Sequence, residues 1–468
     1  MIKPLLLLLA TGFANLLFAQ DITGDWHGQL DIQGMKLRLV LHIQQEGDGL
    51  KATLDSPDQG AFGLPAGEIK YAAPVLTFAM PNLGVTYKGE WQAASESFAG
   101  TFTQGSQGIP LTLGRKVLEA EKSERPQEPK PPFPYRAEDL TFANEKAGGI
   151  KLAGTLTLPE GKGPWPAAIL ISGSGPQNRD EALLGHKPFL VIADYLTRKG
   201  IAVLRFDDRG VGASEGDFQA ATSADFATDV AAAVKFLRQR PDIRPAQVGL
   251  IGHSEGGLVA PMVAAKLPEV AFAVLLAGPG VNGEKVILHQ SKLIDAVGEK
   301  PESVIQEQLA LSKGVFKILR KKADSAQAEQ AIRAYLQREI PKLSAAARTD
   351  FEPLDQAIDQ QIKQLNTPWM RFFLTHEPAP LFSKVRCPLL ILNGEKDLQV
   401  DPAQNIPPIE KALKKAKHPD YTIQVLPKLN HLFQHTETGN PSEYAKIAET
   451  FSPEALGLMT EWIGQRCK

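Results

Sequence analysis

Apolar and polar positions alternate with a period of two near the start of the chain. Positions 37, 39, 41 and 43 are Leu, Leu, Leu and Ile, and charged or titratable side chains stand between them at 38 and 42. This alternation is typical of a strand with one buried face. A turn at 46–49 and a return run at 50–54 indicate a hairpin. Similar short runs occur at 75–80, 85–91, 98–103 and 109–113. The pattern predicts a small antiparallel β domain, either a sandwich or a barrel, over residues 20–116.

The following segment, residues 117–134, interrupts this pattern with charge and proline. Its central stretch, "EAEKSERPQEPKPPFP", contains almost no apolar residues. Such a composition favours an exposed, semi-rigid linker. We therefore place a domain boundary here and expect a second domain over residues 135–468.

In the second domain, apolar runs of strand length alternate with segments of helical period. The helical segments include those that begin at Pro188 and Ser223. The apolar runs lie at 151–159, 166–175, 200–208, 271–278, 387–394 and 421–427. Nearly continuous apolar strands that alternate with helices predict a mostly parallel sheet with helices on both faces. In such sheets the active site lies at the carboxyl ends of the strands.

Residues from about 284 to 377 break this alternation. They are polar and mostly helical in pattern, and one predicted helical face carries Ile305, Leu309, Phe316 and Leu319. Because the insertion precedes the last strands of the sheet, we expect it to form a helical lid over the strand ends. The simpler alternative is that it only adds packing.

Charge and the N-terminal segment narrow the class of protein. Lys and Arg number 51 against 53 Asp and Glu, a formal net charge of −2, so neither nucleic acid nor an anionic membrane surface is an expected partner. Lys3, an apolar run to Phe18 and the small Ala19 resemble a secretory signal peptide, residues 1–19. The run is too short for a membrane span, which needs roughly 20 apolar residues. We expect export to the periplasm or the extracellular space.

Cys387 and Cys467 are the two cysteines of the chain. Two cysteines offer neither a disulfide scaffold nor the spacing of a metal site, so no metal is expected. Cys387 begins a predicted strand and Cys467 ends the last predicted helix. If that helix runs antiparallel to the strands, both positions reach the same edge of the sheet. We therefore expect a disulfide between them in an oxidising compartment.

The stretch "VGLIGHSEGGLVAPMVAA" holds the strongest chemical signal. It places Ser254 where an apolar strand turns directly into a segment of helical period. Gly252 and Gly256 remove the side chains that would collide in so sharp a turn. The pattern predicts a nucleophile elbow in which the N–H of Glu255 faces the oxyanion. The alternative is a glycine-rich turn without chemistry.

A serine nucleophile needs an imidazole to accept its proton and a carboxylate to orient that imidazole. His431 follows the last predicted strand, and Asp397 follows the strand before it, so both belong to the same sheet edge as Ser254. The chain order Ser254, Asp397, His431 is that of α/β hydrolases. The weaker candidates are His435 for the base, and Glu395 and Asp401 for the acid.

The loop "SGSGPQNRDE", residues 172–181, is expected to supply a second oxyanion donor. The backbone N–H of Ser174 or Gly173 fits this role, and we favour Ser174. His253, beside the serine, is interpreted as structural. The charged cluster at 207–209, Asp-Asp-Arg, is expected to brace a loop rather than to touch substrate.

Several segments together resemble a known superfamily. The segments are "SGSGPQNRDE", "FDDRGVGASEGDF", "GHSEGGLVAPMVAA", "TPWMRFFL", "LNGEKDLQV" and "LNH". Residues from about 135 to 465 resemble the α/β hydrolases, and most closely bacterial exported esterases of the serine aminopeptidase/dienelactone-hydrolase-like group. The β domain lies outside the strongest resemblance. The chain also departs from the group at Glu377, where an aspartate is common.

The resemblance implies an α/β-hydrolase fold with a helical lid, hydrolysis of carboxylic esters and no cofactor. It also implies Ser254 as nucleophile, Asp397 as acid and His431 as base. We therefore expect a small-molecule ester with a short acyl group as substrate. The alternatives are an exported serine peptidase, or a binding protein with a degenerate hydrolase domain. An aminopeptidase needs carboxylates that grip an α-ammonium group, and the lid glutamates lie among lysines and arginines, as solvated faces do. These glutamates are Glu302, Glu307, Glu329 and Glu339.

Overall fold

The computed structural model describes residues 21–32, 35–47, 49–59, 61–104, 107–119, 125–351 and 353–467. The expected signal peptide, residues 1–19, lies outside these ranges. Within them, no helix combines the length and the apolar character that a membrane crossing requires.

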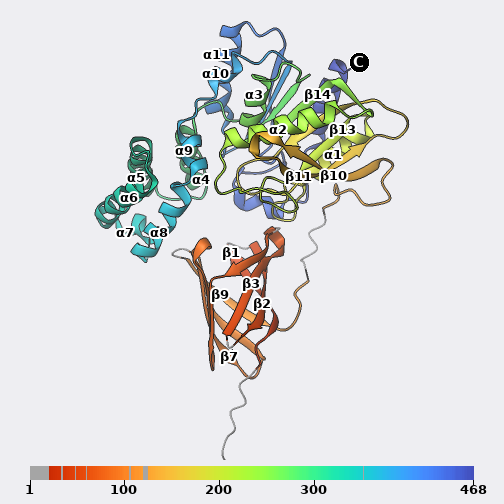
Figure 1. The fold of residues 1–468 in the computed structure, drawn as a ribbon. Coiled ribbons are helices and arrows are strands. Elements are labelled where there is room, and N and C mark those ends of the chain that lie inside the picture. Colours follow the sequence, from red (N-terminus) through yellow and green to blue (C-terminus); the bar gives the residue numbers. More distant parts are fainter. Residues whose placement is uncertain are drawn as a thin grey trace, which may run out of the picture.

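The N-terminal β domain is an antiparallel barrel (Figure 1). Its strands follow one another around the sheet in the order β4-β3-β2-β1-β9-β8-β7-β6-β5. The first strand pairs with the last at His27 and Gly114, and β4 continues directly into β5 through Gly67, whose N–H donates to Ala79 O. The strands are β1 (Gly24–Ile32), β2 (Met35–Glu46), β3 (Gly49–Ser56), β4 (Ala61–Ala66), β5 (Glu68–Ala72), β6 (Val75–Met80), β7 (Val85–Gln92), β8 (Ser97–Gln104) and β9 (Gln107–Gly114).

Large side chains occupy the interior of the barrel. Trp26, Tyr87 and Phe98 are almost fully buried there, together with the alternating apolar residues at 37–43. The sequence pattern did not indicate β1, β4 or β5. In β4, "AFGLPA" contains glycine and proline, and its side chains stay partly exposed, so no clear alternation marks it.

The second domain contains an eight-stranded sheet in the order β10-β11-β13-β12-β14-β15-β16-β17. β11 is antiparallel to both of its neighbours, and the strands from β13 onward in this order are parallel. The strands are β10 (Arg136–Asn144), β11 (Ile150–Leu158), β12 (Trp165–Ile171), β13 (Ala202–Phe206), β14 (Ile243–His253), β15 (Ala273–Leu276), β16 (Leu389–Gly394) and β17 (Tyr421–Leu426). The predicted mostly parallel sheet is confirmed. The sequence pattern missed β10, a polar edge strand.

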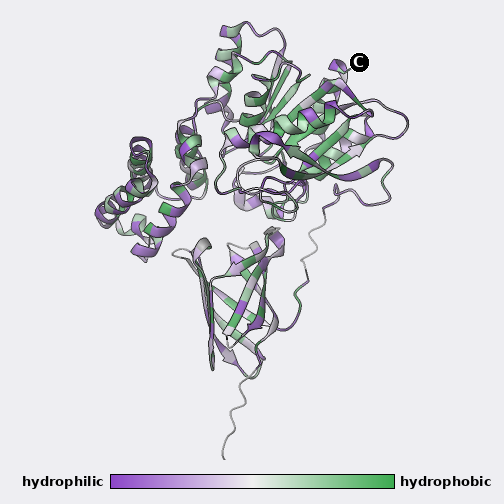
Figure 2. Cartoon of the chain, in the orientation of Figure 1, coloured by the Kyte–Doolittle hydropathy of each residue, from purple (hydrophilic) through white to green (hydrophobic). Residues whose placement is uncertain are grey.

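Helices cover both faces of this sheet, and Figure 2 shows the apolar strands between them. One face packs against α1 (Pro188–Arg198) and α12 (Pro453–Arg466). The other packs against α2 (Ser223–Arg238), α3 (Gly256–Ala264), α10 (Ala379–Phe382) and α11 (Pro402–Ala416). The nearly continuous hydrophobicity of the strands follows from burial on both sides.

The expected disulfide between Cys387 and Cys467 is wrong, because both cysteines are free. Cys387 packs against the apolar cluster that contains α2 and α3, whereas Cys467 belongs to the cluster that contains α1 and α12. The sheet therefore separates the two thiols. Sequence order placed both residues near one edge of the sheet but did not specify the face.

The insertion forms a helical subdomain, which we call the lid. Its helices are α4 (Gly283–Val297), α5 (Glu302–Lys321), α6 (Ser325–Glu339), α7 (Ala345–Arg348), α8 (Leu354–Leu365) and α9 (Pro368–Thr375). The lid has its own apolar core, which includes Phe316, Leu336 and Ile358. Figure 1 shows α4 and α9 connecting this core to the sheet domain. The four apolar residues expected on one face of α5 are all buried.

The barrel touches the lid, and the linker touches the second domain. The side chains of Gln360 and Lys363 on α8 donate to Gly84 O at 3.1 Å and to Pro81 O at 2.8 Å, in the connection between β6 and β7. Within the linker, Gln127 accepts from Phe451 N at 3.0 Å and donates to Phe451 O at 2.6 Å. Arg125 donates to the carbonyl oxygens of Leu184, Ala445 and Ile447. The second half of the expected linker is thus attached to the sheet domain.

This attachment predicts how two truncated chains differ in stability. A chain beginning at Arg125 keeps the contacts to residues 445–451, whereas a chain beginning at Tyr135 loses them. We expect the shorter chain to be less stable by about 2 kcal/mol, because each of several hydrogen bonds contributes roughly 1 kcal/mol. Chemical denaturation of both chains measures the difference, and Gln127→Ala in the full chain is the matched point variant. Equal stability of the two chains would show that the contacts between the linker and residues 445–451 do not stabilise the sheet domain.

Candidate active site

The turn at Ser254 is sterically forced. Ser254 connects β14 to α3 with φ = 52°, in the left-handed region that non-glycine residues rarely adopt. A Cβ at Gly252 would lie 2.0 Å from Gly256 O, and a Cβ at Gly256 would lie 2.1 Å from Ile171 O. Both positions therefore require glycine, and Ser254 N–H donates to Leu276 O at 2.8 Å. Backbone strain of this kind clusters at functional sites, and the geometry is that of the predicted elbow.

Asp397 and His431 form a buried pair at the same edge of the sheet. Asp397 follows β16, His431 follows β17, and Asp397 Oδ2 lies 2.8 Å from His431 Nδ1. The other carboxylate oxygen accepts from Gln399 N at 2.9 Å and from Val400 N at 2.8 Å. The carboxylate is thus fixed by its own loop and orients the imidazole through Nδ1, the arrangement that a serine triad requires.

The weaker candidates have other partners. Glu395 accepts from Lys428 N at 2.9 Å. Asp401 caps α11 through Ala403 N at 3.1 Å and bonds His289 Nε2 at 2.7 Å. His435 is exposed and pairs with Glu449. None of the three contacts Asp397 or His431 through a side-chain hydrogen bond within the described ranges.

Ser254 and His431 are linked through the residue that precedes the serine. His253 Nε2 donates to His431 O at 3.0 Å, and the two imidazole rings lie 4.9 Å apart. In the described part of the chain, Ser254 Oγ makes no hydrogen bond to His431. Catalytic hydrogen bonds are often long in unliganded enzymes and tighten when substrate binds.

His253 buttresses the site through contacts at both of its ring nitrogens. Burial disfavours the charged ring, yet the Glu181 carboxylate at 3.0 Å from Nδ1 raises the pKa of His253 above its usual value. Both ring nitrogens face acceptors, because Nε2 lies 3.0 Å from His431 O. The structural role expected for His253 agrees with this geometry. Sequence analysis did not identify Glu181 as its partner, since the two lie 72 positions apart.

The two candidates for the second oxyanion donor, Gly173 and Ser174, differ in whether the backbone N–H is already hydrogen-bonded. Gly173 N–H donates to Glu181 Oε1 at 2.7 Å and is therefore occupied. Among the described residues, the N–H groups of Ser174 and Glu255 have no hydrogen-bond acceptor. Gly173 still lies against the nucleophile, since a Cβ there would be 3.2 Å from Ser254 Cβ. This geometry favours Ser174 and Glu255 as donors.

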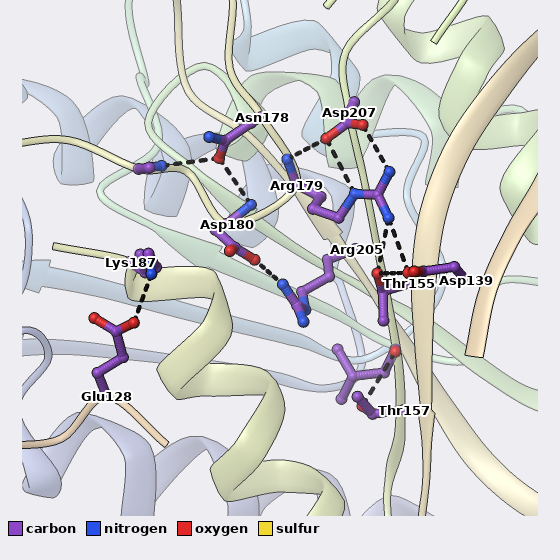
Figure 3. A network of polar contacts seen from close by, with 12 residues as sticks. Glu128, Asp139, Thr155, Thr157, Asn178, Arg179, Asp180, Lys187, Arg205 and Asp207 are labelled. Atoms are coloured by element: carbon purple, nitrogen blue, oxygen red, sulfur yellow. Dashed lines mark hydrogen bonds and ion pairs between the residues drawn. The ribbon is translucent and has the colours of Figure 1, made fainter. Parts of the chain in front are cut away.

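A charged network holds the loop that carries Ser174 (Figure 3). Arg179 lies 2.7 Å from Asp207 Oδ2 and donates to Thr155 Oγ1 at 2.8 Å. Asp180 forms an ion pair with Arg205 on β13. The cluster at 207–209 thus braces loops, as expected, and Arg209 pairs in turn with Asp229 at 2.7 Å.

Two further carboxyl groups lie beneath the same loop. Asp208 accepts from Ser172 Oγ at 2.6 Å and Gln177 N at 2.9 Å, and burial raises the pKa of Asp208 to about 8. Burial also raises the pKa of Glu255. Both line a cavity of about 20 Å³ with Ser172, room for about one water molecule. Among the described residues, no group of three or more His, Cys, Asp or Glu side chains is arranged to hold a metal ion.

The strand order, the strained serine turn and the acid–histidine pair at the carboxyl edge define an α/β hydrolase. Residues 188–438, more than half of the chain, match the family described as serine aminopeptidase, S33, and the chain belongs to that family.

Several proteins of known name are similar to this chain. Esterase EstD of Thermotoga maritima is 28% identical over 299 residues, which are 63% of this chain and 61% of that protein. Thiohydrolase aneE of Aspergillus aculeatus is 37% identical over 113 residues, 24% of this chain and 33% of that protein. The α/β hydrolase GrgF from Penicillium sp. sh18 superimposes with a TM-score of 0.43 at 18% identity, over 71% of this chain and 99% of that one. The chain spans less than two thirds of the length of these two curated relatives.

The raised pKa of Asp208 predicts a pH dependence of stability. An Asp in the unfolded chain titrates near ~3.9, so between about pH 4 and pH 8 the folded protein holds a proton that the unfolded chain has released. The free energy of unfolding therefore falls as pH rises through this window. We expect Asp208→Asn to lessen that fall between pH 5 and 8 by roughly 1 kcal/mol or more.

Urea denaturation at several pH values measures this difference. Asp217→Asn, which removes an exposed carboxylate from the same loop, is the matched control for the loss of a carboxyl group there. Parallel profiles for Asp208→Asn and the unmodified protein would show that Asp208 is ionised in the fold.

Proposed function

We propose that this chain is a serine esterase that hydrolyses carboxylic esters with short acyl groups through an acyl-enzyme intermediate. The observation that carries the proposal is the Asp397–His431 pair, 2.8 Å apart, at the sheet edge where Ser254 is held in a strained turn. The esterase among the relatives supports the same chemistry.

The proposed reaction has two halves, acylation of the serine and hydrolysis of the acyl-enzyme, and the same catalytic groups act in both. Ser254 Oγ attacks the acyl carbon while His431 Nε2 accepts the hydroxyl proton, and Asp397 stabilises the imidazolium. The N–H groups of Glu255 and Ser174 bind the oxyanion. The C–O bond to the alcohol breaks, and the imidazolium returns the proton to the departing alkoxide. Water then attacks the acyl-enzyme by the same steps and releases the carboxylic acid.

An aminopeptidase, which the family description names, is the second candidate. It needs free carboxylates for the α-ammonium group of the substrate, and the acidic side chains considered for that role have other partners. Asp180 pairs with Arg205, and Glu181 pairs with His253. The four lid glutamates bond to lid residues, as follows: Glu302 to Gln306, Glu307 to Ser344, Glu329 to Arg333, and Glu339 to Arg338 and Lys342. These contacts favour the esterase.

The first test is substitution of the proposed nucleophile and base. We expect Ser254→Ala and His431→Ala each to lower kcat for p-nitrophenyl butyrate by about 10⁴-fold or more, as in other serine triads. His435→Ala, the exposed neighbouring histidine, is the matched control and should stay near the unmodified rate. Near-normal turnover by folded Ser254→Ala would refute both the proposed esterase mechanism and the alternative serine peptidase.

The second test separates the esterase from the peptidase. An alkoxide leaves readily, whereas an amine must be protonated as it departs and a peptide must be held in register. We expect kcat/KM for p-nitrophenyl acetate or butyrate to exceed that for aminoacyl p-nitroanilides by at least ~100-fold, about 2.7 kcal/mol in barrier. Comparable or faster cleavage of the anilides would establish the peptidase instead.

A further inference from the structure

Glu255 connects three parts of the second domain at one carboxylate oxygen. Its Oε1 accepts from Ser223 Oγ at 2.5 Å, at the start of α2, and from Trp369 Nε1 at 2.7 Å, on lid helix α9. Glu255 is only 4% exposed, so neither hydrogen bond can be replaced by bulk water without rearrangement. The residue that follows the nucleophile is thus held by the lid as well as by the sheet domain.

Trp369 is fixed within the base of the lid. Its ring stacks on Phe373 with centroids 5.1 Å apart and planes 12° apart. Phe373 in turn fills the space beside Gly283 at the start of α4, where an added Cβ would lie 2.2 Å from the Phe373 ring. Through Phe373, Trp369 is therefore packed against both helices, α4 and α9, that connect the lid to the sheet domain.

We propose that Trp369 is a positioning residue that couples the lid to the oxyanion donor of Glu255. This inference rests on the proposed function. The side chain and the N–H of Glu255 belong to one residue at a sharp turn, so a shift of the carboxyl group also tilts the peptide that binds the oxyanion. A displacement of α9 removes one of the two donors to Oε1. The oxyanion site is therefore complete only when the base of the lid is in place.

The substitution Trp369→Phe tests the coupling, because it keeps an aromatic ring against Phe373 and removes only the N–H donor. Deletion of one oxyanion donor costs about 10²–10³ in rate, and a displaced donor costs less. We expect kcat for p-nitrophenyl butyrate to fall about 10-fold with KM within about 2-fold. Affinity for a trifluoromethyl ketone, whose adduct carries an oxyanion, should fall by the same factor.

Two further variants separate positioning from general damage. Trp462→Phe also removes a tryptophan hydrogen bond, from Nε1 to Thr422 Oγ1 at 3.3 Å, but on the other face of the sheet. It should match Trp369→Phe in thermal stability and keep the unmodified kcat. Glu255→Ala removes the acceptor of both donors, and its kcat should fall at least as much as that of Trp369→Phe.

The decisive readout is the rate at which a fluorophosphonate labels Ser254 in the full chain. Absence of labelling in the unmodified protein would contradict the proposed function itself. Normal labelling there, with an equal rate in Trp369→Phe, would overturn only the coupling. The coupling would also be overturned if Trp369→Phe lost kcat but bound the ketone as tightly as the unmodified protein. An equal loss of kcat in Trp462→Phe would overturn it as well.

Discussion

The close approach of backbones around Ser254 is the constraint on which the site depends. β14 turns into α3 so sharply that two positions have no room for a Cβ, and the serine itself takes a left-handed conformation. Such a turn survives only if the surrounding structure holds it. β12 and β15 flank β14 on either side, and Leu276 O accepts from Ser254 N–H. The parallel sheet thus stabilises the strained turn, and the turn exposes the hydroxyl group of Ser254.

The sequence was sufficient for features that local pattern and chain order determine. Continuous apolar runs predicted most strands of the sheet domain, and Gly252 and Gly256 marked the turn because no other residue fits there. Asp397 and His431 could be chosen because the carboxyl ends of parallel strands meet at one edge. Geometry then distinguished Asp397 from Glu395 and Asp401, which share that edge but have other partners.

Features that depend on contacts between distant segments were not predictable. The Glu181–His253 pair and the Trp369–Glu255 bond join residues 72 and 114 positions apart, and no spacing rule indicates them. The failed cysteine pairing has the same cause, since sequence order gives the edge of a sheet but not its face. Strands such as β4 and β10 escaped notice because partial exposure weakens the alternation that reveals a strand.

The contact between barrel and lid involves lid side chains and barrel backbone. Gln360 and Lys363 donate to carbonyl oxygens of Pro81 and Gly84, and Gly84 has φ = 61°. A Cβ at Gly84 would lie 2.1 Å from the Gln360 amide nitrogen. These two hydrogen bonds therefore depend on the backbone shape of one barrel turn and on the glycine at position 84. A foreign barrel that presents the same turn, with glycine at that position, would satisfy the same two donors.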